Sequence, residues 1–182
     1  LSTTATPLPM AVELCDYLLF YSFIDEGTTD EQLLDNTEVL PRYSDGKNVQ
    51  IIAVSVAGRG GTGSFVVNYT NQDGVAGRIT PTIFDKSVTS NGQLVSTESA
   101  TANRVGPFLP LQAGDTGVRS IQSVTMLSAD VGLFTLVLIR PLAKTQIRGI
   151  DAPVEVDYFK DQVNLPEIKD DAYLNLLCHP VG

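Results

Sequence analysis

The feature that most constrains the fold is the run GLFTLVLI at residues 132–139, in which nearly every position is apolar. Successive side chains of a strand point to opposite faces, so an extended segment of this kind needs cover on both sides. The apolar stretch that contains it is far shorter than the ~20 residues of a membrane-spanning helix. We therefore predict that residues 132–139 form the most buried strand of a packed sheet.

Other short apolar runs follow along the chain, and turn signals separate them. Phe65, Val67 and Tyr69 alternate with smaller or polar residues, as they do in a half-buried strand. We predict strands at residues 14–24, 49–57, 64–70, 75–84, 118–126, 132–139, 154–159 and 173–178. We predict turns at residues 43–46, 71–74 and 113–117.

The connections are less regular. The glycine-rich residues 58–63 predict a hairpin between the strands on either side of them. Residues 28–36 carry an N-cap-like threonine before acidic residues, which indicates either one short helical turn or an ordered acidic loop. Residues 85–104 are rich in Ser, Thr and Asn, so we expect an exposed hairpin or mobile loop with little contribution to the core.

Many short strands at this spacing predict an all-β protein, an antiparallel β-sandwich of jelly-roll-like type. The 182 residues suit one such domain. Residues 1–13 mix Ser, Thr and Pro with little periodicity, so we assign them to an extended N-terminal arm and residues 14–182 to a single β-sandwich domain. Because the chain starts at Leu1 without methionine, we expect its N-terminus to be processed or incomplete.

Charge limits the partners. The net charge of −9 repels phosphate backbones, so we expect no nucleic-acid partner, and we expect no membrane partner because no apolar stretch is long enough. Charged residues make up 18%, below the roughly 25% usual in globular proteins. This composition indicates either a lightly charged surface or one that neighbouring chains partly cover.

The two cysteines, Cys15 and Cys178, lie near opposite ends of the chain. They lack the paired spacing of a zinc or redox site. A disulfide between them needs the two ends to meet in space, whereas free thiols behave as small hydrophobes. We favour free thiols, because the chain has no disulfide framework.

No motif for nucleophilic catalysis is present. His179 is the only histidine, and no G-x-S-x-G sequence surrounds any serine. Cys178 adjoins His179, but neighbouring residues of a strand point to opposite faces. Residues 58–63 resemble a phosphate-binding loop superficially and lack its G-K-[ST] ending. We predict that the protein is not an enzyme and that it has no catalytic, cofactor-binding or metal-binding residues and no cofactor.

Acidic residues and tyrosines are the remaining candidates for binding groups. The acidic groups at residues 25–31 and 170–171 lack the spacing of an EF-hand, which favours solvated loops over a calcium site. Single tyrosines are available as sugar-stacking platforms, but the chain has no tryptophan. The triplet Asn68-Tyr69-Thr70 matches a glycosylation acceptor inside a predicted strand, and we regard the match as chance. The tyrosines are Tyr17, Tyr21, Tyr43, Tyr69, Tyr158 and Tyr173.

Three stretches carry a resemblance to structural proteins of tailed-bacteriophage virions. They are TTDEQ at residues 28–32, NYTN at 68–71 with the following Asp73-Gly74, and PLQAGDTGVRSI at 110–121, and the likeness spans residues 15–180. The chain most resembles capsid decoration (cement) or capsid-associated proteins.

The resemblance implies a homo-oligomer, with a trimer favoured, docked on major capsid protein or other virion proteins. It implies a location at the capsid surface after synthesis in the host cytoplasm, and it supplies no site residues. We expect the arm and residues 86–103 to make the contacts. The alternatives are a jelly-roll carbohydrate-binding module and a fibre or tail component that recognises host glycans, which would place an exposed tyrosine beside paired Asp and Asn.

Overall fold

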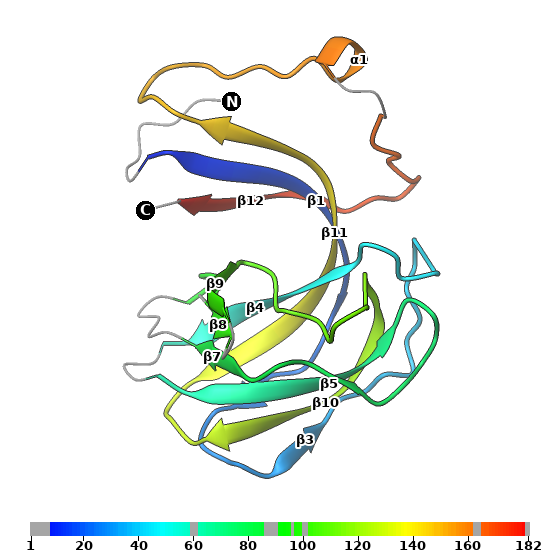
Figure 1. Ribbon diagram of the computed structural model, residues 1–182, viewed down its shortest axis with the longest axis vertical. Coiled ribbons are helices and arrows are strands. Elements are labelled where there is room, and N and C mark those ends of the chain that lie inside the picture. Colours follow the sequence, from blue (N-terminus) through cyan, green and yellow to red (C-terminus); the bar gives the residue numbers. More distant parts are fainter. Residues whose placement is uncertain are drawn as a thin grey trace. The chain divides into compact units, whose positions relative to one another are not determined.

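The computed structural model describes residues 8–58, 62–85, 91–95, 97–99, 102–161 and 165–180. Within these ranges the chain forms twelve strands and one short helix, α1 (Figure 1). The strands are β1 Met10–Phe20, β2 Ile24–Asp25, β3 Glu31–Leu33, β4 Gln50–Ala57, β5 Ser64–Asn71, β6 Arg78–Ile79, β7 Ile83–Asp85, β8 Thr97–Ser99, β9 Ala102–Gly106, β10 Val118–Ser128, β11 Leu133–Ile147 and β12 Leu174–Pro180; α1 is Tyr158–Asp161.

The strands form two antiparallel sheets that pack together, which confirms the predicted β-sandwich. One sheet has the order β12-β1-β11-β2, with β4 also paired to β11. The other has the order β3-β10-β5-β7-β8-β9, with β6 paired to β5. Strands distant in sequence are neighbours in both sheets, a feature shared by Greek-key and jelly-roll sandwiches.

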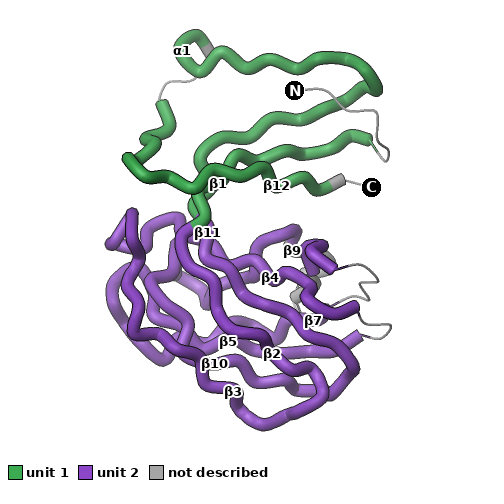
Figure 2. The backbone as a smooth tube through the Cα atoms, turned by 180° about the vertical axis from the view of Figure 1, so that it is seen from behind, with its two compact units in different colours: residues 1–17, 140–182 green, residues 18–139 purple. Residues whose placement is uncertain are grey.

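The chain divides into two compact units, where the sequence led us to expect one domain over residues 14–182 (Figure 2). Unit 2 comprises residues 18–139 and contains the sandwich, and unit 1 comprises residues 1–17 and 140–182. Strands β1 and β11 contribute to both units. Unit 1 contains the first part of β1, the second part of β11, all of β12 and α1.

The core of unit 2 lies between its two sheets. Phe65, Val67 and Tyr69 of β5 are fully buried, as their alternation predicts. They face Phe134 and Leu136 of β11, and the rings of Phe65 and Phe134 lie 5.0 Å apart between centroids. Residues 136–139 of β11 are buried on both faces, whereas Leu133 and Thr135 are only partly buried, so the predicted two-sided burial holds for the second half of the run.

The predicted hairpin across residues 58–63 is wrong. Strand β4 pairs with β11 in one sheet, whereas β5 pairs with β10, β6 and β7 in the other. Both strands are apolar enough to pair in either sheet, and a glycine-rich connection does not select between them. When β4 pairs with β11, the apolar run of β11 gains a neighbouring strand, which a strand with two apolar faces needs.

Two other elements considered in the sequence are not formed. Of the two alternatives for residues 28–36, the helical turn is not formed: the segment is irregular except for the three residues of β3, which pair with β10. The strand predicted at 154–159 is not formed; the segment ends in α1, where Asp157 accepts a hydrogen bond from the N–H of Phe159 at 3.0 Å, as a capping residue does.

The Ser/Thr-rich region contributes more to the core than predicted. It contains the antiparallel pair β8–β9, and Val95 is 1% exposed and belongs to the core cluster. At the N-terminus, residues 10–13 lie in β1 and pair with β12, although we assigned them to the arm. Residues 1–7, 86–90, 96, 100 and 101 lie outside the described residues. No helix in the described part of the chain is long and apolar enough to cross a membrane.

Candidate functional site

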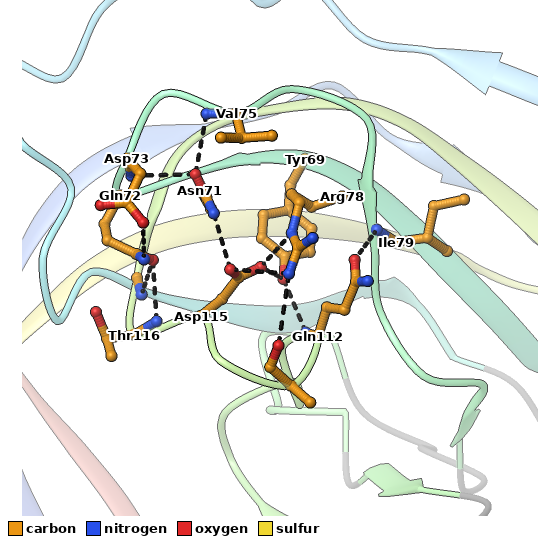
Figure 3. Close-up of polar contacts among 12 residues, drawn as sticks. Tyr69, Asn71, Gln72, Asp73, Val75, Arg78, Ile79, Gln112, Asp115 and Thr116 are labelled. Carbon is orange, nitrogen blue, oxygen red and sulfur yellow. Dashed lines mark hydrogen bonds and ion pairs between the residues drawn. The ribbon is translucent and has the colours of Figure 1, made fainter.

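Among the described residues of unit 2, a network of hydrogen bonds surrounds Asp115 (Figure 3). Its carboxylate is 3% exposed and accepts hydrogen bonds from Tyr69 Oη at 2.6 Å and Asn71 Nδ2 at 2.8 Å. Arg78 donates to both carboxylate oxygens, at 2.9 Å from Nε and 3.1 Å from Nη2. The hydroxyl of Tyr69 also accepts a bond from the N–H of Gln112 at 2.8 Å.

These contacts change the ionisation of the groups. Burial raises the pKa of Asp115, but the hydrogen bonds from Arg78, Tyr69 and Asn71 outweigh it and hold that pKa below its ordinary value. The pKa of Tyr69 is raised by burial and by its bond to Asp115, so its hydroxyl stays protonated. The bond to Asp115 raises the pKa of Arg78.

A second set of bonds secures the same turn from the other side. Gln72 Oε1 accepts the N–H groups of Thr116 at 2.9 Å and Gly117 at 3.1 Å. The Gln72 carbonyl accepts two bonds from Arg119, at 3.0 and 2.6 Å. Asn71 Oδ1 accepts the N–H groups of Asp73 and Val75, at 3.0 Å each.

The network therefore links β5, β6 and the turn before β10. Both oxygens of Asp115 accept donors from the chain itself, and the ring of Tyr69 is fully buried. This arrangement differs from the exposed tyrosine beside paired Asp and Asn that a glycan site requires. Its role is to fix the turn between residues 111 and 117.

The histidine and the two cysteines lie in unit 1, where β1 and β12 pair. Cys178 lies opposite Val12 and His179 opposite Ala11, so these two residues point to opposite faces as predicted. His179 Nε2 is 3.6 Å from Glu13 Oε1, and that histidine therefore faces a carboxylate. Both cysteines are free thiols, as we favoured, although β1 and β12, which carry them, are paired. Burial, followed by the charge of Glu13, raises the pKa of Cys15 to about 12.

The other sequence candidates are not brought together. Asp25 Oδ1 accepts the N–H of Gly27 at 2.8 Å, and Glu31 Oε1 accepts the hydroxyl of Ser123 at 2.6 Å. No group of three or more His, Cys, Asp or Glu residues in the described ranges is placed to hold a metal. Gly63, at the end of the glycine-rich segment, donates its N–H to the buried carboxylate of Asp85 in β7. Residues 59–61 of that segment are outside the described ranges.

Sequence reasoning missed two features of the surface. Unit 1 has a mainly apolar groove of about 720 Å³ between a strand face and the segment before α1. Unit 2 exposes large apolar side chains near the end of β10, in the connection from β10 to β11, and just before β2. We call Phe23, Leu127 and Val131, which are 64%, 50% and 79% exposed, the apolar rim. A sequence signal for the rim exists only at Val131, which lies between two turn residues.

The segments of the rim are joined by backbone contacts. Ile24, next to Phe23, pairs with Phe134, and the N–H of Asp130 donates to Glu26 O at 2.8 Å. Leu33, which is 79% exposed, lies on the edge strand β3 beside β10.

Comparisons with protein-family models, curated proteins and solved structures found no match to this chain.

Proposed function

We propose that this chain is a structural component of a bacteriophage virion, a decoration (cement) protein that binds and stabilises the capsid shell through protein contacts. The observation that carries the proposal is the contrast between its polar and apolar groups. The polar network around Asp115 holds the turn between residues 111 and 117, whereas the apolar rim exposes large apolar side chains to solvent. Clustered exposed apolar side chains are typical of surfaces that bind other proteins.

The rim suits a lattice of protein subunits better than a small ligand. A contact made by apolar side chains gains its stability from the area that it removes from water. The major capsid protein is the proposed partner, and the virion surface is the proposed location. The resemblance of residues 28–32, 68–74 and 110–121 to virion proteins supports the same role.

The test is binding to capsid shells of the same virus, measured by size exclusion with light scattering. We expect the protein to co-elute with shells and Val131→Asp to weaken this binding at least tenfold. Val39→Asp is the matched control, because Val39 is 80% exposed and lies outside the rim. A protein that ignores the shells at every ratio overturns the proposal, and glycan screening then tests the carbohydrate-binding alternative.

A further inference from the structure

The outer edge of β12 is the feature from which we infer a second interface. In unit 1 the strand order is β12-β1-β11, and β12 pairs only with β1 in the described part of the chain. Its sequence LNLLCHP contains no Asp, Glu, Lys or Arg. Natural proteins usually blunt an edge strand with charges, proline or a covering segment, because unpaired backbone groups recruit other strands.

The opposite edge of the same sheet is blunted in this way. Pro141 lies within the part of β11 that belongs to unit 1, and exposed Lys144 follows it. The hydroxyl of Tyr158 bonds both backbone groups of Lys144, at 3.1 Å from the N–H and 3.3 Å from the carbonyl. The contrast between the two edges singles out β12 as the open one.

The pairing with β1 shows which backbone groups of β12 point outward. The N–H of Tyr17 donates to Tyr173 O at 2.9 Å, and the register stays constant along β12. In an antiparallel ladder, alternate residues bond to the same neighbour, so the odd-numbered residues face β1. Leu174, Leu176 and Cys178 therefore direct their N–H and C=O groups away from the sheet. In agreement, the Leu176 N–H donates to the neighbouring side chain of Asn175, at 2.8 Å from its Oδ1.

We propose that β12 pairs antiparallel with β12 of a second copy of this chain, about a two-fold axis at Leu176. In this register Leu176 lies opposite Leu176 of the second copy, and Leu174 lies opposite Cys178. All outward N–H groups of the three residues then find acceptors. A shift one way places Leu174 opposite Pro180, which has no N–H. A shift the other way brings in Ala172, which lies outside β12 and whose N–H bonds the backbone carbonyl of Lys169 at 3.3 Å, whereas the Leu176 N–H only has to exchange the side-chain acceptor Asn175 Oδ1 for a backbone carbonyl.

The side chains also favour a second copy as the partner. Directly opposite residues of an antiparallel pair share a face, so both strands continue the face of Val12 and Leu14. Leu174 and Leu176 are 45% and 44% exposed, and this arrangement covers them. Two chains that each carry a charge of −9 approach most easily along a strand without charges.

This contact is isologous and closes at two copies, whereas the resemblance to decoration proteins implied a trimer. It also lies in unit 1, whereas the rim lies in unit 2, so the inference does not depend on the proposed function. The two are separated by experiment, because shell binding is tested with Val131→Asp and self-association with changes in β12.

The first test measures the mass of the full chain by light scattering. We expect a dimer for the wild type and a monomer for Leu176→Pro, because proline removes an outward N–H that β1 does not use. The control is Leu33→Lys. It removes a leucine that is more exposed than Leu176 from another edge strand, β3, and should leave the dimer intact. A wild-type monomer or trimer, or a dimer that survives Leu176→Pro, overturns the proposal.

The second test checks the register and does not depend on whether the proline variant folds. Side chains of a hydrogen-bonded antiparallel pair share a face and their Cβ atoms are about 5.5 Å apart, which is too far for an unstrained disulfide but within reach of a short bifunctional thiol cross-linker. Such a reagent should therefore join Leu174→Cys to Cys178 of the second copy, as found by peptide mapping. Asn175→Cys is the matched control, because its side chain lies on the other face. Failure of the first variant to cross-link to Cys178, or equal cross-linking of the control, overturns the register.

Discussion

At the scale of single residues, Asp115 is held by three side chains. An aspartate suits this position because its two oxygens accept four hydrogen bonds from three side chains in a space that leaves 3% of it exposed. Asparagine has nearly the same shape but turns an acceptor into a donor. Such a change leaves donors of Arg78 and Asn71 facing another donor.

Asp115→Asn should therefore lower the Tm of the protein at pH 7 by about 5 °C or more. The folded-state pKa of Asp115 is depressed, so its contribution is present above the unfolded pKa of about 3.9 and is lost as pH falls through the folded pKa. The difference in Tm between variant and wild type should narrow below about pH 4. Thermal melts followed by circular dichroism at pH 2.5–7 measure it.

The control for this change is Asp35→Asn. Asp35 is exposed, and its carboxylate bonds the backbone and hydroxyl of Thr37, which are two residues away. Asp35→Asn should leave the Tm of the protein almost unchanged at pH 7. Equal effects of the two substitutions would show that the Asp115 network does not hold the turn.

At the scale of elements, the close approach between the turn at 43–46 and the start of β10 depends on glycine. A Cβ at Gly117 would lie 2.0 Å from Gly46 O and 2.8 Å from the N–H nitrogen of Asn48. The two segments are held there by the bond from Asn48 N–H to Thr116 O at 3.1 Å. No rotation of a side chain relieves a clash between Cβ and backbone.

Gly117→Ala should consequently lower the free energy of unfolding by about 1–3 kcal/mol, as overpacking does elsewhere. Urea unfolding followed by tyrosine fluorescence measures the loss. Gly149→Ala is the comparison, because its Cβ would meet a side-chain atom, Ala152 Cβ, at 3.1 Å. If Gly117→Ala lowered the free energy of unfolding no more than Gly149→Ala does, the turn at 43–46 and the start of β10 would be able to move apart without cost.

At the scale of the whole molecule, the two units differ in how much they bury. The cluster between the sheets of unit 2 contains residues from β1, β2, β4, β5, β7, β10 and β11. In unit 1 the buried apolar side chains of the described residues are Val12, Cys15, Ile147 and Leu177. Opening a region costs free energy in proportion to the contacts that it breaks.

Native-state hydrogen exchange should therefore be slower in unit 2 than in unit 1. We expect peptides that cover β5 and β10 to exchange at least tenfold more slowly than peptides that cover residues 148–157. Mass spectrometry after timed labelling at constant pH resolves these peptides. Uniform exchange across both units would indicate that the chain opens only as a whole.

The sequence by itself determined which residues lie inside. The alternation of Phe65, Val67 and Tyr69 and the apolar run at 132–139 identify strands and their buried faces, because burial follows the side-chain period of two. The turns at 43–46 and 71–74 are also encoded locally, in residues that accept positive φ; Gly46 and Gly74 have φ of 68° and 78°. These features depend on neighbours a few residues away.

Only the tertiary structure decided which strands pair and which polar groups meet. The strand at 49–57 joins β11 instead of its neighbour in sequence, and β3 replaces a helical turn because β10 offers it backbone partners. Asp115 meets Tyr69 across 46 residues of sequence, and no local pattern signals that contact. The physical reason is that any apolar strand can pair with any other, so the choice rests on the summed burial and hydrogen bonding of the complete fold.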